Sequence, residues 1–339
     1  MPERSPSMKI DVHSHLMPSG VFDHPPRDYR SKWSPDRASV VLEDEVSERR
    51  GRPAKGDLLD ASAIVARQKE QQVDLSIVGG WVDAMAAPTN AESQSDWCRL
   101  ISSELAAAVE RQASLRWLAS LPDLDGGLAA EELSVAARAG AVGGILATSF
   151  MNGGLGRADL EPLWANAERL GLPIMIHPGV YDPSETPIAG ELLIPVFYPY
   201  LTTRAAVEMI RAGVPDRYPD LKVVLVHAGG FLPYQFGRVE HWLATDRVPT
   251  VPKQSPSTTS SALSWFYYDT VVHSRKVVEF LIDLVGSSQL LAGSDCPFAM
   301  SDWSLIGANG DDYLGSSDRA AILGANAERI FPLHRGTTS

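Results

Sequence analysis

The chain has 339 residues, of which 44% are hydrophobic, and this is enough for one substantial apolar core. Acidic residues outnumber basic ones by 42 to 30, giving a formal net charge of −12 and a sequence pI near 5.1. This balance, with no basic stripe, argues against a nucleic-acid partner, because binding to a polyanion needs clustered basic residues. No apolar run approaches the roughly 18 residues of a membrane helix. We therefore expect a cytoplasmic protein with no membrane contact, in which Cys98 and Cys296 are reduced thiols.

Short apolar runs alternate with longer stretches at helical spacing, a rhythm typical of βα units and a parallel sheet. Residues 1–7 are polar and are predicted to form a disordered tail. Eight candidate strands follow, at 8–15, 74–80, 115–122, 142–149, 172–179, 222–230, 266–273 and 289–298. Eight is the strand number of a (β/α)8 barrel, so we expect an α/β fold with a single barrel domain over residues 8–335.

The segments between these strands divide into helices and loops. Amphipathic patterns predict helices over 58–72, 130–140 and 160–171, the last of them ending at Gly171. Residues 16–57 and 180–200 do not fit the rhythm and follow the first and fifth strands, so we expect loops there. Barrels carry lids and substrate contacts at such strand ends, and 16–57 is predicted to be a small lid insertion. A third surface loop is expected over 246–262.

The first strand ends in a histidine pair with one residue between its members. Side chains alternate faces along a strand, so His13 and His15 point the same way, into the mouth of the barrel. Two imidazoles at this separation can share one metal ion. The pair alone is equally compatible with two hydrogen-bonded structural histidines.

Other strand ends carry the same kind of side chain. His177, His227 and His273 end the fifth, sixth and seventh strands, and Asp295 lies in the eighth, so five of the 8 histidines gather at one end of the barrel. Three imidazoles and one carboxylate with room for water are typical of a catalytic metal site. Zinc fits nitrogen ligands best, with Mn²⁺, Fe²⁺ or Co²⁺ as substitutes.

The order of motifs HxH, His-Pro, HxGG and Ser-Asp-x-Pro-Phe resembles the amidohydrolase superfamily, in its aminocarboxymuconate-semialdehyde decarboxylase-like branch. The resemblance runs from about residue 8 to the C-terminus. It implies metal ligands at His13, His15, His177 and Asp295. It also implies that His227 is the acid/base next to the metal, with Asp295 able to accept a proton as well.

The same resemblance implies a substrate carboxylate held by arginine. Gly237-Arg238-Val239 matches a family Gly-Arg whose arginine binds that carboxylate, in some members from the neighbouring subunit of a dimer, so we expect a homodimer. A second family arginine precedes the first barrel helix, and Arg52 is its nearest match. Arg49 and Arg50 compete for that assignment. His273 is a further candidate for substrate binding.

One metal ion per chain is expected. Superfamily members with two metals bridge them by a carbamylated lysine at the end of the fourth strand, and this sequence has no lysine between Lys69 and Lys222. Gly179 and Cys296 depart from the residues familiar at the mouth in this branch. They leave the identity of the substrate open.

These features predict a cofactor-independent decarboxylase, a carbon–carbon lyase that acts on a small unsaturated or aromatic carboxylic acid. The metal with Arg238 would orient the carboxylate, and His227 would protonate the carbon that loses CO₂. The alternative is hydrolysis of a lactone, amide or related bond by hydroxide on the metal. A metal sensor without catalysis, or a phosphoesterase that also begins with HxH, fits the motifs less well.

Overall fold

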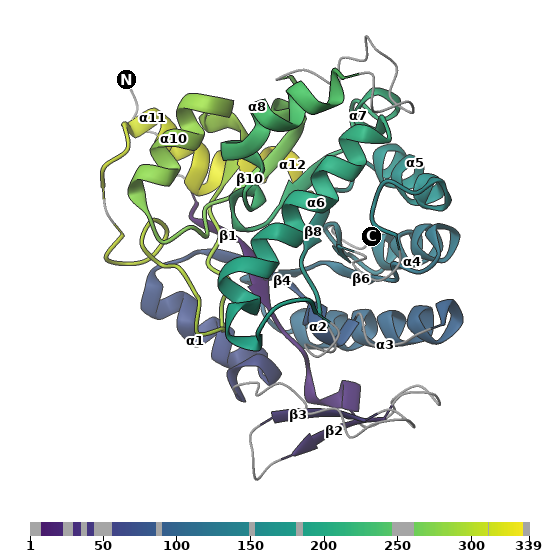
Figure 1. Cartoon of the computed structure of the whole chain (residues 1–339). Coiled ribbons are helices and arrows are strands. Elements are labelled where there is room, and N and C mark those ends of the chain that lie inside the picture. Colours follow the sequence, from purple (N-terminus) through teal and green to yellow (C-terminus); the bar gives the residue numbers. More distant parts are fainter. Residues whose placement is uncertain are drawn as a thin grey trace.

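The structure is a computed structural model, and it describes residues 8–22, 30–34, 39–43, 56–85, 90–148, 153–180, 186–245, 261–310 and 312–334 (Figure 1). All eight expected strands are present. They are β1 (Ile10–His15), β4 (Leu75–Gly79), β5 (Leu115–Trp117) with β6 (Ala119–Leu121), β7 (Gly144–Ala147), β8 (Ile174–His177), β9 (Val223–Leu225), β10 (Phe266–Asp269) and β11 (Leu290–Leu291). The third predicted strand is split at Leu118, whose N–H donates to the carbonyl of Val78.

These strands close into a barrel. Neighbouring strands pair in parallel in the orders β1-β4-β5 and β6-β7-β8-β9-β10-β11. The first and last strands meet where Val12 N–H donates to Ala292 O at 2.9 Å and His15 N–H donates to Cys296 O at 2.7 Å. Because all eight strands run the same way, their carboxyl ends share one mouth, where such barrels place their chemistry.

Helices cover the outside of the barrel (Figure 1). Most barrel strands, such as β4 and β8, are buried on both faces, which explains why they read as apolar runs and not as alternating patterns. The principal helices are α1 (Ala61–Gln71), α3 (Ala91–Glu110), α4 (Gly126–Arg138), α5 (Glu161–Leu170), α6 (Tyr198–Arg211), α8 (Leu232–Leu243), α10 (Arg275–Val285) and α12 (Asn326–Ile330). In α5, Leu163, Trp164 and Ala167 face the core, and Gly171 ends the helix at φ +66° as predicted.

The insertion after β1 contains an antiparallel hairpin of β2 (Arg30–Ser34) and β3 (Ser39–Glu43), which pairs with none of the barrel strands in the described part of the chain. Its ends carry two short helical turns, η1 (Ser19–Phe22) and η3 (Gly56–Leu59). The role of this segment as a lid remains a prediction.

The loop expected over 180–200 was wrong from Gly190 onward, where the chain is helical, whereas residues 181–185 lie outside the described part of the chain. Gly190–Leu192 and Leu193–Phe197 form short helical turns, η6 and η7, and α6 begins at Tyr198. The prolines suggested a loop, but Pro199 lies in the first turn of α6, where a missing N–H costs no hydrogen bond.

Most of the predicted 246–262 loop, residues 246–260, lies outside the described residues. Its last two residues belong to α9 (Ser261–Trp265). Within the described ranges, the helices are all too short or too polar to cross a membrane.

Candidate metal centre

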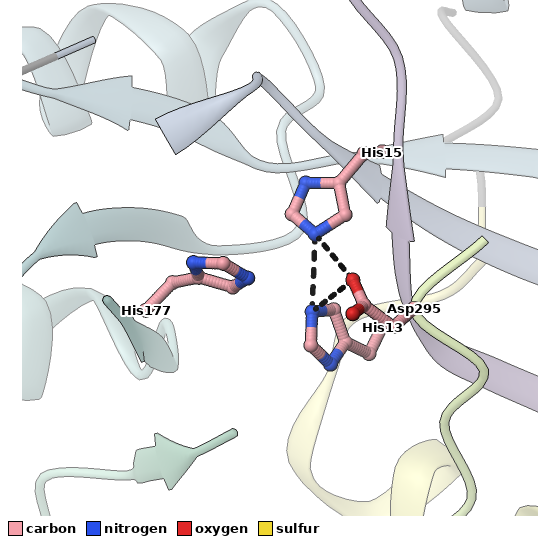
Figure 2. A group of neighbouring side chains, drawn as sticks. All are labelled: His13, His15, His177 and Asp295. Atoms are coloured by element: carbon pink, nitrogen blue, oxygen red, sulfur yellow. Dashed lines mark hydrogen bonds and ion pairs between the residues drawn. The ribbon is translucent and has the colours of Figure 1, made fainter. Parts of the chain in front are cut away.

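Four side chains converge at the carboxyl ends of the strands. His13 and His15 come from β1, His177 ends β8, and Asp295 follows β11. All four residues are buried, and one potential ligand atom from each lies within 4.8 Å of the others (Figure 2). The structure therefore assembles the ligand set that the motifs implied, from residues up to 282 positions apart.

The three imidazoles present the same nitrogen to the centre. The Nδ1 atoms face oxygen acceptors: Asp269 Oδ2 at 2.6 Å for His13, Gly80 O at 3.2 Å for His15, and Pro178 O at 2.6 Å for His177. A carbonyl oxygen or a carboxylate at Nδ1 holds the proton on that nitrogen. The Nε2 lone pairs of all three rings are therefore available as metal ligands.

The polar atoms that face the centre have the character of a cation site. His177 Nε2 and Asp295 Oδ1 are buried and have no hydrogen-bond partner among the described residues. His13 Nε2 lies 3.1 Å from His15 Nε2 and 3.4 Å from Asp295 Oδ1. Buried acceptors that face one another at these distances are costly without a shared cation. Three nitrogens and one oxygen fit a divalent transition metal.

The protonation states of His177 and Asp295 also favour a metal site. Burial lowers the pKa of His177 well below its ordinary value, so this imidazole is neutral at pH 7. Burial alone would raise the pKa of Asp295, but the neighbouring imidazoles of His13 and His15 hold it well below its usual range. The centre thus offers a neutral nitrogen and an ionised carboxylate, the forms that bind metal.

His227 lies next to this group without belonging to it. Its Nε2 is 3.7 Å from Asp295 Oδ2, and its ring centroid lies 5.5 Å from that of His13. The backbone is left-handed at His227, Ala228 and Asp295, with φ of +54°, +53° and +58°. Such conformations are rare outside glycine and are found where a structure fixes a side chain for function. The position suits a group that exchanges protons beside the metal.

Asp11 was not recognised as part of the site from the sequence. Its buried carboxylate accepts hydrogen bonds from the hydroxyls of Ser14 and Ser294, both at 2.6 Å, and from the N–H groups of His13 and Ser294. It therefore ties the HxH strand to the segment that carries Asp295. The signal was an acidic residue inside an otherwise apolar strand.

Asp269 was also missed. It is completely buried at the end of β10, where one oxygen contacts His13 and the other accepts the N–H groups of Ala228 at 2.9 Å and Val271 at 3.2 Å. The sequence instead predicts that this strand ends at His273. The strand in fact ends at Asp269, so the aspartate and not the histidine reaches the metal ligands.

The remaining predicted site residues are not joined to the centre by any contact within the described residues. His273 is exposed, with its backbone N–H bonded to Asp302 Oδ2 at 2.5 Å. Arg238 is exposed on α8. Arg52, Arg49 and Arg50 lie outside the described residues. Their roles in binding substrate stay predictions.

A closed (β/α)8 barrel with a buried three-histidine, one-aspartate site at its mouth defines a metal-dependent barrel enzyme. The family model described as "Amidohydrolase" matches residues 10–333, and the chain belongs to this family.

Several proteins to which the chain is similar are named as decarboxylases. The chain is 35% identical to 6-methylsalicylic acid decarboxylase of Penicillium expansum over 154 residues, covering 44% of this chain and 45% of that protein. It is 24% identical to 2-amino-3-carboxymuconate-6-semialdehyde decarboxylase of Dictyostelium discoideum over 87% of this chain and 83% of that one. In structure it is similar to a dihydroxybenzoic acid decarboxylase from a Polaromonas species, solved with manganese and 2-nitroresorcinol (TM-score 0.74, 22% identity, 97% and 98% coverage).

Proposed function

We propose that the chain is a metal-dependent decarboxylase of small aromatic or unsaturated carboxylic acids. The observation that carries the proposal is the arrangement of His13, His15 and His177, each with Nδ1 held by an acceptor and Nε2 aimed at Asp295. The relatives reported above are named as decarboxylases, whether their substrates are aromatic acids or a muconate semialdehyde. Hydrolysis of a lactone or amide therefore has less support.

The metal would be held by those three histidines and Asp295. It would supply a positive charge that orients a substrate carboxylate and an adjacent oxygen substituent. Nitrogen-rich ligation favours zinc, and manganese in the Polaromonas relative makes it the alternative. Metal analysis of the purified protein distinguishes the two ions.

The chain's own residues would perform the proton transfer. When CO₂ leaves, the bond between the ring or alkenyl carbon and the carboxylate breaks, and that carbon must gain one proton. His227 is placed to donate it, because Nε2 faces the centre 3.7 Å from Asp295 Oδ2 and the side chain is 17% exposed. The partly open side allows substrate to approach and a proton to return from solvent.

Arg238 is proposed to bind substrate across a homodimer interface. Tyr234, Arg238 and Trp242 lie four residues apart along α8, so they form one stripe on its exposed face. Tyr234 is 79% exposed, and Phe231 and Tyr200 add further exposed aromatic surface nearby. Aromatic residues and arginine are enriched in protein interfaces, and such a stripe suits a second copy of the chain.

The test of activity is a screen for CO₂ release from 6-methylsalicylic acid, a dihydroxybenzoic acid and 2-amino-3-carboxymuconate-6-semialdehyde, before and after removal of metal by a chelator. We expect at least one acid to be turned over, and the activity to return when one equivalent of Zn²⁺ or Mn²⁺ is added. Hydrolysis of a lactone by the metal-loaded protein, with no CO₂ from any acid, would contradict the proposal.

The test of the interface mixes two variants of low activity, Arg238→Ala and His227→Asn, after reversible dissociation. If Arg238 acts in the neighbouring subunit, half of the dimers are mixed and each holds one complete site, so about a quarter of the wild-type activity should return. No recovery in a preparation shown to contain mixed dimers would place Arg238 outside the partner's site.

A further inference from the structure

We infer that Asp269 is a positioning residue that fixes the metal-binding form of His13 and, through the same carboxylate, the turn that carries His227. The inference rests on the proposed metal site. It assigns to the end of β10 a role in both metal binding and proton transfer, although no atom of Asp269 belongs to the ligand group.

The first contact of Asp269 is with the metal ligand. Its Oδ2 lies 2.6 Å from His13 Nδ1, and both side chains are completely buried. An ionised carboxylate can only accept a hydrogen bond, so Nδ1 must carry the proton and Nε2 must carry the lone pair. This is the tautomer that binds a metal through Nε2. The His13 ring cannot turn without breaking this contact.

The second contact is with the backbone after β9. Asp269 Oδ1 accepts the N–H of Ala228 at 2.9 Å and that of Val271 at 3.2 Å. Ala228 has φ of +53° and follows His227, which is also left-handed. This conformation is unfavourable for a residue with a Cβ atom, so two such residues in succession need fixed partners. The charged acceptor is such a partner, since it orients the peptide directly after His227.

The two contacts use different oxygens of the carboxylate, and both oxygens act as hydrogen-bond acceptors. Replacing the carboxylate by an amide would turn one of these two acceptors into a donor. In Asp269→Asn, the two backbone N–H groups keep the carbonyl oxygen on their side. The amide –NH₂ then faces His13 Nδ1 and donates to it, which moves the imidazole proton to Nε2. The side chain keeps its size, but His13 is held in the form that does not ligate.

Asp302 provides a matched control. It is a second buried aspartate at the mouth, and its carboxylate also accepts backbone N–H groups, from Val272, His273 and Ser304. It has no contact with the four metal ligands through its side chain within the described residues. Asp302→Asn therefore removes a buried carboxylate without changing the acceptor at His13 Nδ1.

The experiment measures metal affinity by competition with a chelator, and the His13 tautomer by ¹⁵N–¹H spectra of histidine-labelled protein assigned with a His13→Gln variant. Asp269→Asn should bind Zn²⁺ or Mn²⁺ about 10- to 100-fold more weakly than wild type, with proton density moved from Nδ1 to Nε2. Asp302→Asn should match wild type in both readouts, even if it melts at lower temperature.

Wild-type affinity in Asp269→Asn, or an unchanged His13 tautomer, would overturn the inference. An equal loss of affinity in Asp302→Asn would also overturn it, because the effect would then follow from removing any buried carboxylate at the mouth. Both readouts are independent of turnover. If no substrate is decarboxylated while metal affinity responds as expected, the proposed reaction fails and the role of Asp269 stands.

Discussion

Replacing His227 tests whether this residue donates a proton without being a metal ligand. The residue is left-handed at φ +54°, so His227→Asn is the preferred variant, because asparagine tolerates this conformation better than alanine. Nδ1 of His227 has no hydrogen-bond partner in the described part of the chain, and the Nε2 contact with Asp295 is a 3.7 Å ion pair. Its loss should therefore change stability by less than about 1 kcal/mol.

The effect on turnover should be much larger. Loss of a general acid lowers kcat by about 10² to 10⁴, or ~2.7–5.5 kcal/mol in the activation free energy. The measurements are metal content per chain, melting temperature and kcat for whichever acid the wild-type protein decarboxylates. Metal content near wild type with kcat reduced at least a hundredfold is expected. Loss of the metal would make His227 a ligand, and a kcat within threefold of wild type would remove it from the proton transfer.

Three further outcomes are expected. His13→Ala or Asp295→Ala should reduce metal content, near one ion per chain in wild type, to a small fraction, and elemental analysis showing an unchanged content would refute the ligand assignment. Arg238→Ala should cost about 2–5 kcal/mol in kcat/KM and Arg238→Lys should restore little, since lysine lacks the planar fork that grips a carboxylate; near-normal steady-state kinetics in both would instead favour a neutral substrate. Gly230→Ala should lower the free energy of unfolding by about 2–5 kcal/mol, because φ is +64° and the new Cβ would lie 2.1 Å from Pro199 O. Gly171→Ala, at φ +66° with open space around it, should cost only ~1–2 kcal/mol. Equal losses in chemical denaturation would rule out the clash at Gly230.

The barrel could be predicted from the sequence because its strands and helices are marked by patterns within short segments of the chain. Most of the barrel strands are short apolar runs buried on both faces, and such runs stand out between amphipathic helices. The histidine ligands were predictable for a similar reason, since His13 and His15 lie two residues apart on one face of a strand and His177 ends another strand. Asp295 was predicted from its place in the eighth apolar run, and the family motif then implied that it is a metal ligand.

The supporting carboxylates could not be predicted in the same way. Asp11 and Asp269 look like ordinary polar residues within apolar runs, and their importance lies in partners far along the chain, such as Ser294 and His13. The end of a strand is equally hard to predict, because β10 stops at Asp269 although the β-branched residues Thr270, Val271 and Val272 follow it. Strand ends decide which side chains reach the mouth.

The closure of the barrel also sets when the metal site comes into being during synthesis. Asp11 and the HxH motif on β1 lie at the start of the chain, whereas their partners Ser294 and Asp295 are made about 280 residues later. At roughly 5–20 residues per second, the ribosome needs about 15–55 s to cover that distance. A nascent chain therefore offers only an incomplete ligand set while the residues between His13 and Asp295 are being made. Tight metal capture is delayed until the last strand has docked against the first, which makes the bound ion a marker of chains that have finished folding.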